Sequence, residues 1–184
     1  MTSNKTVFFI IGSLLIILGV FMLFPYWIQI LYAENSHSFL SSSFITIFIG
    51  MLFVLANLQK KYQLNLKQTF LFSTFAWIAI AGFGALPFIL SDINFSLSDS
   101  FFESMSGITT TGSTVVENLD TSPKSILLWR AIMQWLGGVG IIVMAITVLP
   151  LLKVGGMQLF KIESSDKPEK ILPRTTQVAF IIIS

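Results

Sequence analysis

Charged residues are scarce in this sequence, and cysteine is absent altogether. Only 11% of its 184 residues are charged and 54% are hydrophobic, whereas soluble domains carry roughly 25% charged residues. So few polar side chains cannot cover a globule, which excludes a soluble enzyme, a nucleic-acid-binding domain and a disordered tail. The lack of cysteine excludes disulfides, thiolate metal sites and cysteine nucleophiles. The composition is that of an integral membrane protein.

Four apolar stretches are long enough to cross a bilayer, whose hydrocarbon core of about 30 Å needs about 20 helical residues. They cover Val7–Leu31, Phe39–Leu58, Thr69–Leu90 and Ile126–Leu152. These stretches predict an all-α integral membrane protein. A fifth apolar run covers residues 176–184, where we expect the start of the next transmembrane helix of a longer protein. The alternative for this run is a short amphipathic segment at the membrane surface.

The first apolar stretch also has a feature of a secretory signal peptide, because Lys5 precedes it. Its apolar run is far longer than the roughly 7–15 residues of a signal peptide, so we expect a retained transmembrane helix. Pro25 lies inside this stretch, and we expect it to kink the helix.

The distribution of Lys and Arg predicts the orientation of the chain. With a cytoplasmic N-terminus, nine of the eleven cationic residues fall in cytoplasmic segments, as the positive-inside rule requires. The two cations on the other side are Lys124 and Arg130. We expect the Arg130 side chain to extend toward the outer interface.

The segment between the third and fourth spans, residues 91–125, is too apolar for an ordinary loop and too short for another crossing. Ser96 and Asp99 have the spacing of a capping box at a helix N-terminus. The following residues, Leu97–Ser106, predict a helix of about 15 Å, half the hydrocarbon thickness. Gly107 is expected to end this helix.

The half-length helix is followed by Ile108–Thr114, a β-branched run that favours an extended backbone. A polar stretch, Glu117–Lys124, then returns to the outer surface. Together these elements predict a re-entrant pore loop, in which carbonyl oxygens can replace the hydration shell of potassium. Gly112 is expected to adopt a conformation that a Cβ would forbid. An ordinary exterior loop is the alternative.

Several motifs from about Thr69 onward resemble the Trk/Ktr/HKT superfamily of potassium transporters. Residues 101–114 (FFESMSGITTTGST) are similar to its first pore loop, and residues 129–130 and 134–141 (WR, QWLGGVGI) to the helix that follows. Residues 149–152, 155–160 and 172–174 (LPLL, GGMQLF, LPR) resemble the connection to a second repeat. Two additional helices before the first repeat are similar to the TrkH type rather than the shorter KtrB type.

The resemblance implies four helix–pore-loop–helix repeats around one potassium pathway, with a single repeat present in this chain. It places an appended pair of transmembrane helices in residues 1–68 and the first repeat in residues 69–152. A cytoplasmic connector follows in residues 153–175, and the next helix starts in residues 176–184. One repeat would supply about a quarter of a carbonyl-lined selectivity filter.

The same resemblance implies which residues bind the ion. The backbone oxygens of four filter residues would coordinate potassium: Thr110, Thr111, Gly112 and Ser113. In this superfamily a glycine at the position of Gly112 accompanies a preference for potassium over sodium. Three residues are expected to support the filter: Glu103, Gly107 and Thr109. Simple exposure at the outer mouth is the alternative for Glu103.

Glycines cluster in the helix that follows the loop. Gly137, Gly138 and Gly140 have neither the following Lys-Ser/Thr nor the preceding strand of a phosphate-binding loop, and they lie in an apolar run. We therefore expect them to permit close helix packing. In the same helix, Trp129 is expected at the membrane interface and Trp135 in buried packing.

These observations predict potassium transport across a bacterial inner membrane, with potassium as the transported ion, no cofactor and no catalysis. The resemblance implies a homodimer and a cytoplasmic nucleotide-binding TrkA-type regulatory subunit. A non-conducting membrane scaffold with an exterior Thr/Ser-rich loop is the alternative from a different class. A membrane-embedded enzyme is a weaker alternative, because the spans contain no set of polar catalytic residues.

Overall fold

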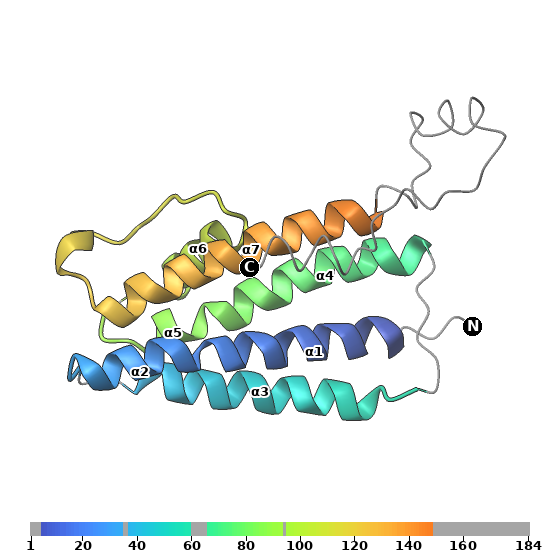
Figure 1. The fold of residues 1–184 in the computed structure, drawn as a ribbon, viewed down its shortest axis with the longest axis horizontal. Helices are drawn as coiled ribbons and strands as arrows, with labels where there is room; N and C mark the ends of the chain where they lie inside the picture. The colour runs from blue at the N-terminus through green and yellow to red at the C-terminus, as the bar shows by residue number, and fades with distance from the viewer. Residues whose placement is uncertain (1–4, 35–36, 60–65, 94, 149–184) are drawn as a thin grey trace, which may run out of the picture. The chain divides into compact units, whose positions relative to one another are not determined.

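The computed structural model describes residues 5–34, 37–59, 66–93 and 95–148, and the regular elements among them are all helical. Figure 1 shows the elements, which are α1 (Lys5–Phe21), α2 (Leu23–Leu31), α3 (Ser38–Ala56), α4 (Leu66–Gly84), α5 (Leu86–Ile89), α6 (Leu97–Ile108), the 3-10 turn η1 (Leu119–Thr121) and α7 (Lys124–Val148). The chain divides into two compact units, residues 1–137 and 138–184. The contacts described below lie within the first unit.

Among the described residues, four helical stretches are long and apolar enough to cross a membrane. They are Lys5–Leu31, Ser38–Ala56, Lys67–Ile89 and Lys124–Val143. Each coincides with one of the four predicted spans, so the prediction of an all-helical membrane protein is confirmed for the described residues. The end of the fourth predicted span (149–152), the connector (153–175) and the start of the next helix (176–184) lie outside the described residues.

Proline interrupts two of the four spans. In the first span, α1 ends at Phe21 and α2 starts at Leu23. Pro25 has no N–H with which to pair the carbonyl four residues earlier, which explains a break at this place. In the third span, Pro87 lies in the first turn of α5. The interruption expected at Pro25 is therefore found at Met22, about one turn before the proline.

The break at Pro87 creates a buried contact with α7. The Phe88 N–H bonds to Ala85 rather than to Gly84, which leaves the Gly84 carbonyl oxygen free. The indole nitrogen of Trp129 donates to that oxygen at 3.0 Å. Trp129 is completely buried, so its ring packs inside the protein and is not the expected interfacial anchor. Trp135 is 45% exposed in the described structure, contrary to its expected burial.

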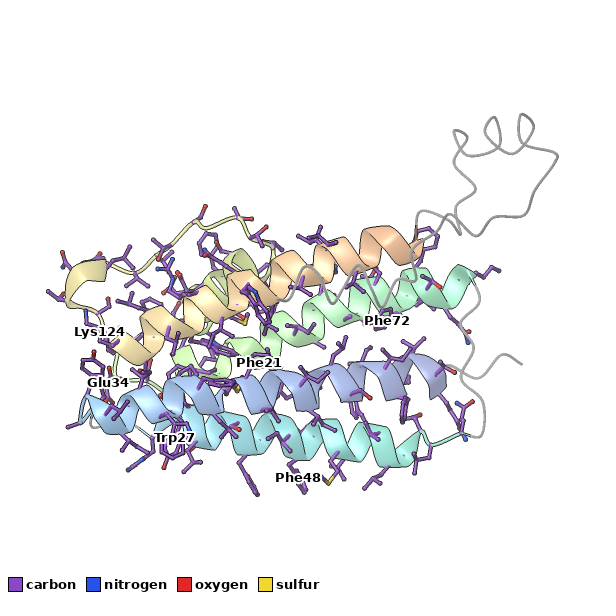
Figure 2. All side chains as sticks on the ribbon, in the orientation of Figure 1. Phe21, Trp27, Glu34, Phe48, Phe72 and Lys124 are labelled. Atoms are coloured by element: carbon purple, nitrogen blue, oxygen red, sulfur yellow. The ribbon has the colours of Figure 1, made fainter. Side chains whose placement is uncertain are left out.

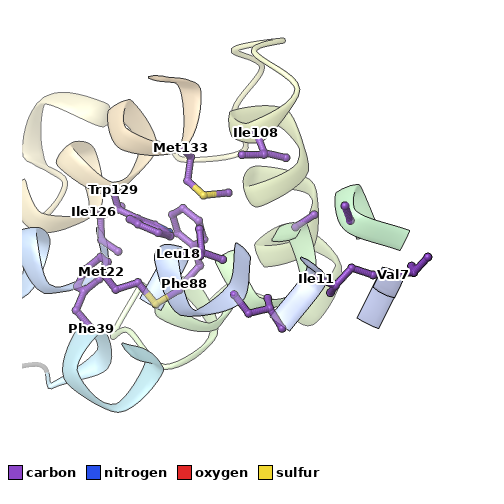
Figure 3. Close-up of a cluster of buried hydrophobic side chains, with 13 residues drawn as sticks. Val7, Ile11, Leu18, Met22, Phe39, Phe88, Ile108, Ile126, Trp129 and Met133 are labelled. Carbon is purple, nitrogen blue, oxygen red and sulfur yellow. The ribbon is translucent and has the colours of Figure 1, made fainter. Parts of the chain in front are cut away.

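The core of the first unit lies where α1, α2, α3, α5 and α7 meet. Figure 3 shows Met22, Phe39, Phe88, Ile126 and Trp129 gathered around this point. The rings of Phe39 and Trp129 meet edge to face, with centroids 6.0 Å apart, an arrangement that aromatic pairs prefer. The N-terminal helices and α7 therefore share one core.

Glycines allow α1 and α3 to approach closely. A Cβ added at Gly12 would lie 2.7 Å from the Gly50 carbonyl oxygen, and one at Gly50 would lie 2.8 Å from the Gly12 carbonyl oxygen. Further along the same contact, the Ser43 hydroxyl donates to the Gly19 carbonyl at 2.7 Å. Small residues and hydroxyl groups are typical of helix pairs in membranes, where lipid gives no hydrophobic driving force between helices.

Replacing Gly12 with alanine should destabilise this helix pair by about 1–3 kcal/mol, the usual range for overpacking. The nearest atoms are backbone and a Cβ, which cannot move aside. Gly82→Ala in α4 is the matched control, because a Cβ there meets no atom within 4 Å and alanine favours helix. The measurement is the free energy of unfolding in detergent. Equal effects of the two substitutions would contradict the close contact.

Candidate functional site

A short helix, α6, begins the candidate site. The predicted capping box is present: the Ser96 hydroxyl accepts the Asp99 N–H at 3.1 Å, and the Asp99 carboxylate accepts the Ser96 N–H at 3.3 Å. The helix has 12 residues, so its length is about 18 Å. This is too short to cross a hydrocarbon core of about 30 Å.

The end of α6 differs from its prediction, because the helix continues through Gly107 to Ile108. The residue that stops it is Thr110, whose φ is +58°. The Thr111 N–H bonds to the Ser106 carbonyl and the Thr110 N–H to the Gly107 carbonyl, both at 3.0 Å. These two bonds define a Schellman motif, which ordinarily places glycine at the left-handed position. Here a threonine occupies it.

Gly107 has a packing role instead. A Cβ at this position would lie 3.0 Å from the Cβ of Met133, so the absence of a side chain lets α7 pack closely on α6. Thr109 follows the helix, and its hydroxyl donates to the Met105 carbonyl at 2.7 Å. It also lies 2.9 Å from the Thr111 hydroxyl. Gly107 and Thr109, two of the three predicted support residues, thus lie at the end of α6.

The segment after α6 is irregular rather than an extended strand. Positive φ angles at Thr110 and at Gly112 (+78°) account for the difference, because they turn the chain away from the β region. The expectation that Gly112 adopts a glycine conformation is confirmed. A Cβ there would be 3.7 Å from its nearest neighbour, the Gln134 amide nitrogen. The constraint at Gly112 is therefore its backbone angle and not lack of space.

In this turn the backbone N–H groups are hydrogen-bonded within the described residues, whereas the carbonyl oxygens are not. The N–H groups of Thr110, Thr111 and Gly112 all bond to carbonyls near the end of α6, those of Gly107 and Ser106. Within the described residues, no hydrogen bond reaches the carbonyl oxygens of these same three residues. As whole residues, all three are exposed. The turn therefore presents oxygen atoms while its donors are occupied.

The chain then runs back alongside α6. The Ser106 hydroxyl donates to the Ser113 carbonyl at 2.6 Å. Three residues earlier on α6, the Glu103 carboxylate accepts the Thr114 hydroxyl and the Val115 N–H, each at 3.0 Å. These bonds order the returning chain antiparallel to the helix. Figure 1 shows it continuing past α6 toward the start of α7.

Glu103 also forms an ion pair with Arg130 of α7, through its other carboxylate oxygen. The Glu103 side chain is 1% exposed and the Arg130 side chain 15% exposed. The expectation for Arg130 is thereby corrected, because its side chain pairs with Glu103 instead of extending to the interface. For Glu103, the alternative of simple exposure is excluded. Because the two charges compensate each other, Arg130 does not present an uncompensated positive charge behind the turn.

Of the three glycines in α7, Gly137 has a defined contact. A Cβ at this position would overlap the carbonyl oxygen of Ile108, the last residue of α6. A side chain at Gly137 would therefore separate α7 from the start of the turn. A Cβ at Gly138 or at Gly140 would meet no atom of the described residues within 4 Å, so no contact there supports their packing roles, which stay predictions.

The sequence analysis missed Ser106 and Thr114 as members of the site. Both lie within the motif of residues 101–114, but serine and threonine are common in loops and their hydrogen bonds depend on how the chain folds back. The pairing of Glu103 with Arg130 was missed for a related reason. The two residues are 27 positions apart, and no helical spacing connects them.

Comparison with known proteins identifies relatives of the whole chain. A family model described as "TrkH: Cation transport protein" matches residues 35–184. The match therefore begins well before Thr69, where the resemblance of the motifs begins, and includes the second predicted span. The Trk system potassium uptake protein TrkH of Vibrio parahaemolyticus is 38% identical over 179 residues, covering 95% of this chain and 37% of the relative. The Trk system potassium uptake protein TrkI of Halomonas elongata is 40% identical over 176 residues, covering 95% and 36%.

A solved structure agrees with these relationships. The crystal structure of the potassium transporter TrkH from Vibrio parahaemolyticus superposes with a TM-score of 0.83 at 34% identity. The match covers 100% of this chain and 37% of that chain. The chain therefore spans little more than a third of the length of the curated relatives it matches.

Replacing Glu103 with glutamine should lower the free energy of unfolding by about 3–5 kcal/mol, because it leaves the largely buried Arg130 without a countercharge. Glu117→Gln is the matched control, since Glu117 is exposed in the same segment. Replacing both partners, as Glu103→Gln with Arg130→Met, should cost less than Glu103→Gln alone. Unfolding in detergent measures all three variants. A Glu103→Gln variant as stable as Glu117→Gln would disprove the pair.

Proposed function

The chain belongs to the TrkH family of cation transport proteins, and from this membership we propose that it supplies part of a potassium-selective pathway across the membrane. The observation that carries the proposal is the turn after α6. Its three N–H groups are bonded to the helix end, while the carbonyl oxygens of Thr110, Thr111 and Gly112 accept no bond from the described residues. The protein is a transporter component and not an enzyme.

The chemistry of the turn suits a partly dehydrated cation. Carbonyl oxygens can replace the water oxygens around potassium, and the occupied N–H groups offer nothing to an anion. The C-terminal end of α6, which carries the negative end of the helix dipole, lies at the same place. The Glu103–Arg130 pair adds no net charge that would repel the ion.

The family resemblance and these properties together support the filter assignment. We propose that the backbone oxygens of Thr110, Thr111, Gly112 and Ser113 coordinate potassium, and that α4–α7 form one helix–pore-loop–helix repeat. A ring of oxygens requires several such turns, so this turn would be about a quarter of the filter. The remaining turns would come from other parts of the complete protein.

The proposed setting is a bacterial inner membrane with the N-terminus in the cytoplasm. The distribution of the eleven cationic residues supports this orientation through the positive-inside rule. The proposed partners are a second copy of the complete protein and a cytoplasmic nucleotide-binding TrkA-type subunit. Family resemblance supports both partners.

Exchanging residues at the two positive-φ positions tests the filter. Gly112→Ser should lower the potassium-to-sodium flux ratio of the complete protein by at least about tenfold, which corresponds to about 1.4 kcal/mol, because serine opposes a φ of +78°. Thr110→Gly is the matched control, since glycine adopts the existing φ of +58° without strain. Ion flux into vesicles is the measurement. An unchanged ratio in Gly112→Ser would remove Gly112 from the proposed filter, and the absence of any flux in the unsubstituted complete protein would favour the non-conducting scaffold.

Removing the Ser106 hydroxyl should also reduce selectivity, by about three- to tenfold, the range for a net hydrogen-bond contribution of about 1 kcal/mol. The hydroxyl fixes the Ser113 carbonyl, so Ser106→Ala releases one proposed ion ligand. Ser100→Ala on the same helix is the control, because the buried Ser100 hydroxyl has no partner among the described residues. The flux ratio is again measured. Equal ratios in the two variants would remove Ser106 from the proposed filter.

A further inference from the structure

A carboxylate from the N-terminal helices contacts the start of α7. Glu34 lies in the connection between α2 and α3, and one of its oxygens accepts the Ser125 N–H at 3.3 Å. The Ser125 hydroxyl donates to the other oxygen. The two residues are 91 positions apart. Figure 2 shows Glu34 at the same end of the molecule as Lys124, the first residue of α7.

The backbone before Glu34 fixes the place of its side chain. The Glu34 N–H bonds to the Gln29 carbonyl at 2.9 Å, and the Ala33 N–H bonds to the Ile30 carbonyl at 3.3 Å. With Ala33 at a φ of +49°, these bonds form a Schellman motif at the end of α2. Alanine in this conformation is strained, so the backbone at Ala33 and Glu34 holds a definite and unfavourable shape.

The other side of the connection is fixed as well. The Gln29 amide donates to the Ser38 hydroxyl at 3.1 Å, which joins α2 to the first residue of α3. Gln29 and Ser38 are both buried. Glu34 therefore projects from a hairpin that is anchored to both of its helices.

The Glu34 carboxylate provides a hydrogen-bond acceptor for the start of α7. The first N–H groups of a helix have no partner within it, and a negative charge near them is favourable. Glu34 satisfies the N–H of Ser125, the second residue of α7. Ser125 is completely buried with Glu34 in place, so the carboxylate and not bulk water is the partner of its N–H.

Ser125 and Arg130 lie on one helix, about 7.5 Å apart along its axis. A shift of α7 at Ser125 would therefore move Arg130 and, through the ion pair, Glu103. Glu103 holds the returning chain at Thr114 and Val115. A continuous series of contacts thus leads from the N-terminal helices to the proposed filter.

We propose that Glu34 is a positioning residue, and that the N-terminal helical pair fixes the loop after α6 by holding the start of α7. The consequence for ion selectivity rests on the proposed function. The effect of Glu34 on the position of the loop does not rest on the proposed function, because it is inferred from the contacts alone.

The test uses the complete protein that carries this chain, with any other cysteines removed, and the substitution Val115→Cys as a probe. Val115 is 38% exposed, and its N–H bonds to the Glu103 carboxylate. The rate of modification by a thiol reagent in detergent reports the position of the loop. Potassium and sodium fluxes are measured in parallel. The substitutions are Glu34→Ala, Glu34→Gln and Ser125→Ala, with Glu117→Ala as the control for loss of an exposed carboxylate.

Glu34→Ala should raise the modification rate about fivefold, the equilibrium effect of losing an N-terminal cap worth about 1 kcal/mol, and should lower the potassium-to-sodium flux ratio. Glu34→Gln should retain most of both properties, because its amide oxygen still accepts the Ser125 N–H. Ser125→Ala should have a smaller effect, and adding it to Glu34→Ala should have none. Glu117→Ala should leave both measurements unchanged.

An unchanged modification rate in Glu34→Ala and Ser125→Ala would overturn the proposal, even if the variants were less stable. An equal change in Glu117→Ala would also overturn it, since the effect would then be one of charge alone. If the unsubstituted protein carried no potassium, the proposed function would fail. The changes in modification rate would still support or refute the positioning role.

Discussion

The Glu103 carboxylate joins three segments of the chain, and the shape of the candidate site depends on that junction. One oxygen pairs with Arg130 of α7, and the other receives the Thr114 hydroxyl and the Val115 N–H of the returning chain. With its side chain 1% exposed, Glu103 depends on these partners in place of water, since a buried charge without partners is unfavourable. The requirement to satisfy this charge fixes α6, α7 and the loop against one another.

A second constraint is that irregular backbone within a membrane protein must satisfy its polar groups. The turn at Thr110 satisfies its N–H groups with the last carbonyls of α6, which would otherwise be unpaired themselves. Its own carbonyls are left for another partner, and in the proposed function that partner is the ion. The break at Pro87 follows the same rule, because the freed Gly84 carbonyl accepts the Trp129 indole.

In the proposed function, the N-terminal helices support the site and supply no ion ligand. The glycine contacts between α1 and α3 and the core shared by Phe39 and Trp129 make these helices a support for α7. Glu34 is the polar part of this support. A filter that distinguishes ions by the placement of oxygen atoms benefits from a fixed surrounding, because a site holds its geometry only if its supporting residues are fixed.

Local signals were sufficient to predict several features from the sequence. Hydropathy gave the four spans, the Ser96–Asp99 spacing gave the start of α6, and the glycine at position 112 gave its left-handed backbone. Each depends on residues close together in the chain. The motif of residues 101–114 also predicted the family, which the matches to TrkH proteins confirm.

The tertiary structure decided what depends on distant residues. It placed the end of α6 at Ile108, just before the left-handed Thr110, rather than at Gly107. Gly107 lies inside the helix and packs against Met133 of α7. The tertiary structure also placed Arg130 against Glu103 and Glu34 against Ser125. These pairs bring together charges and donors separated by 27 and 91 positions, and only the packing of the helices determines which of them meet.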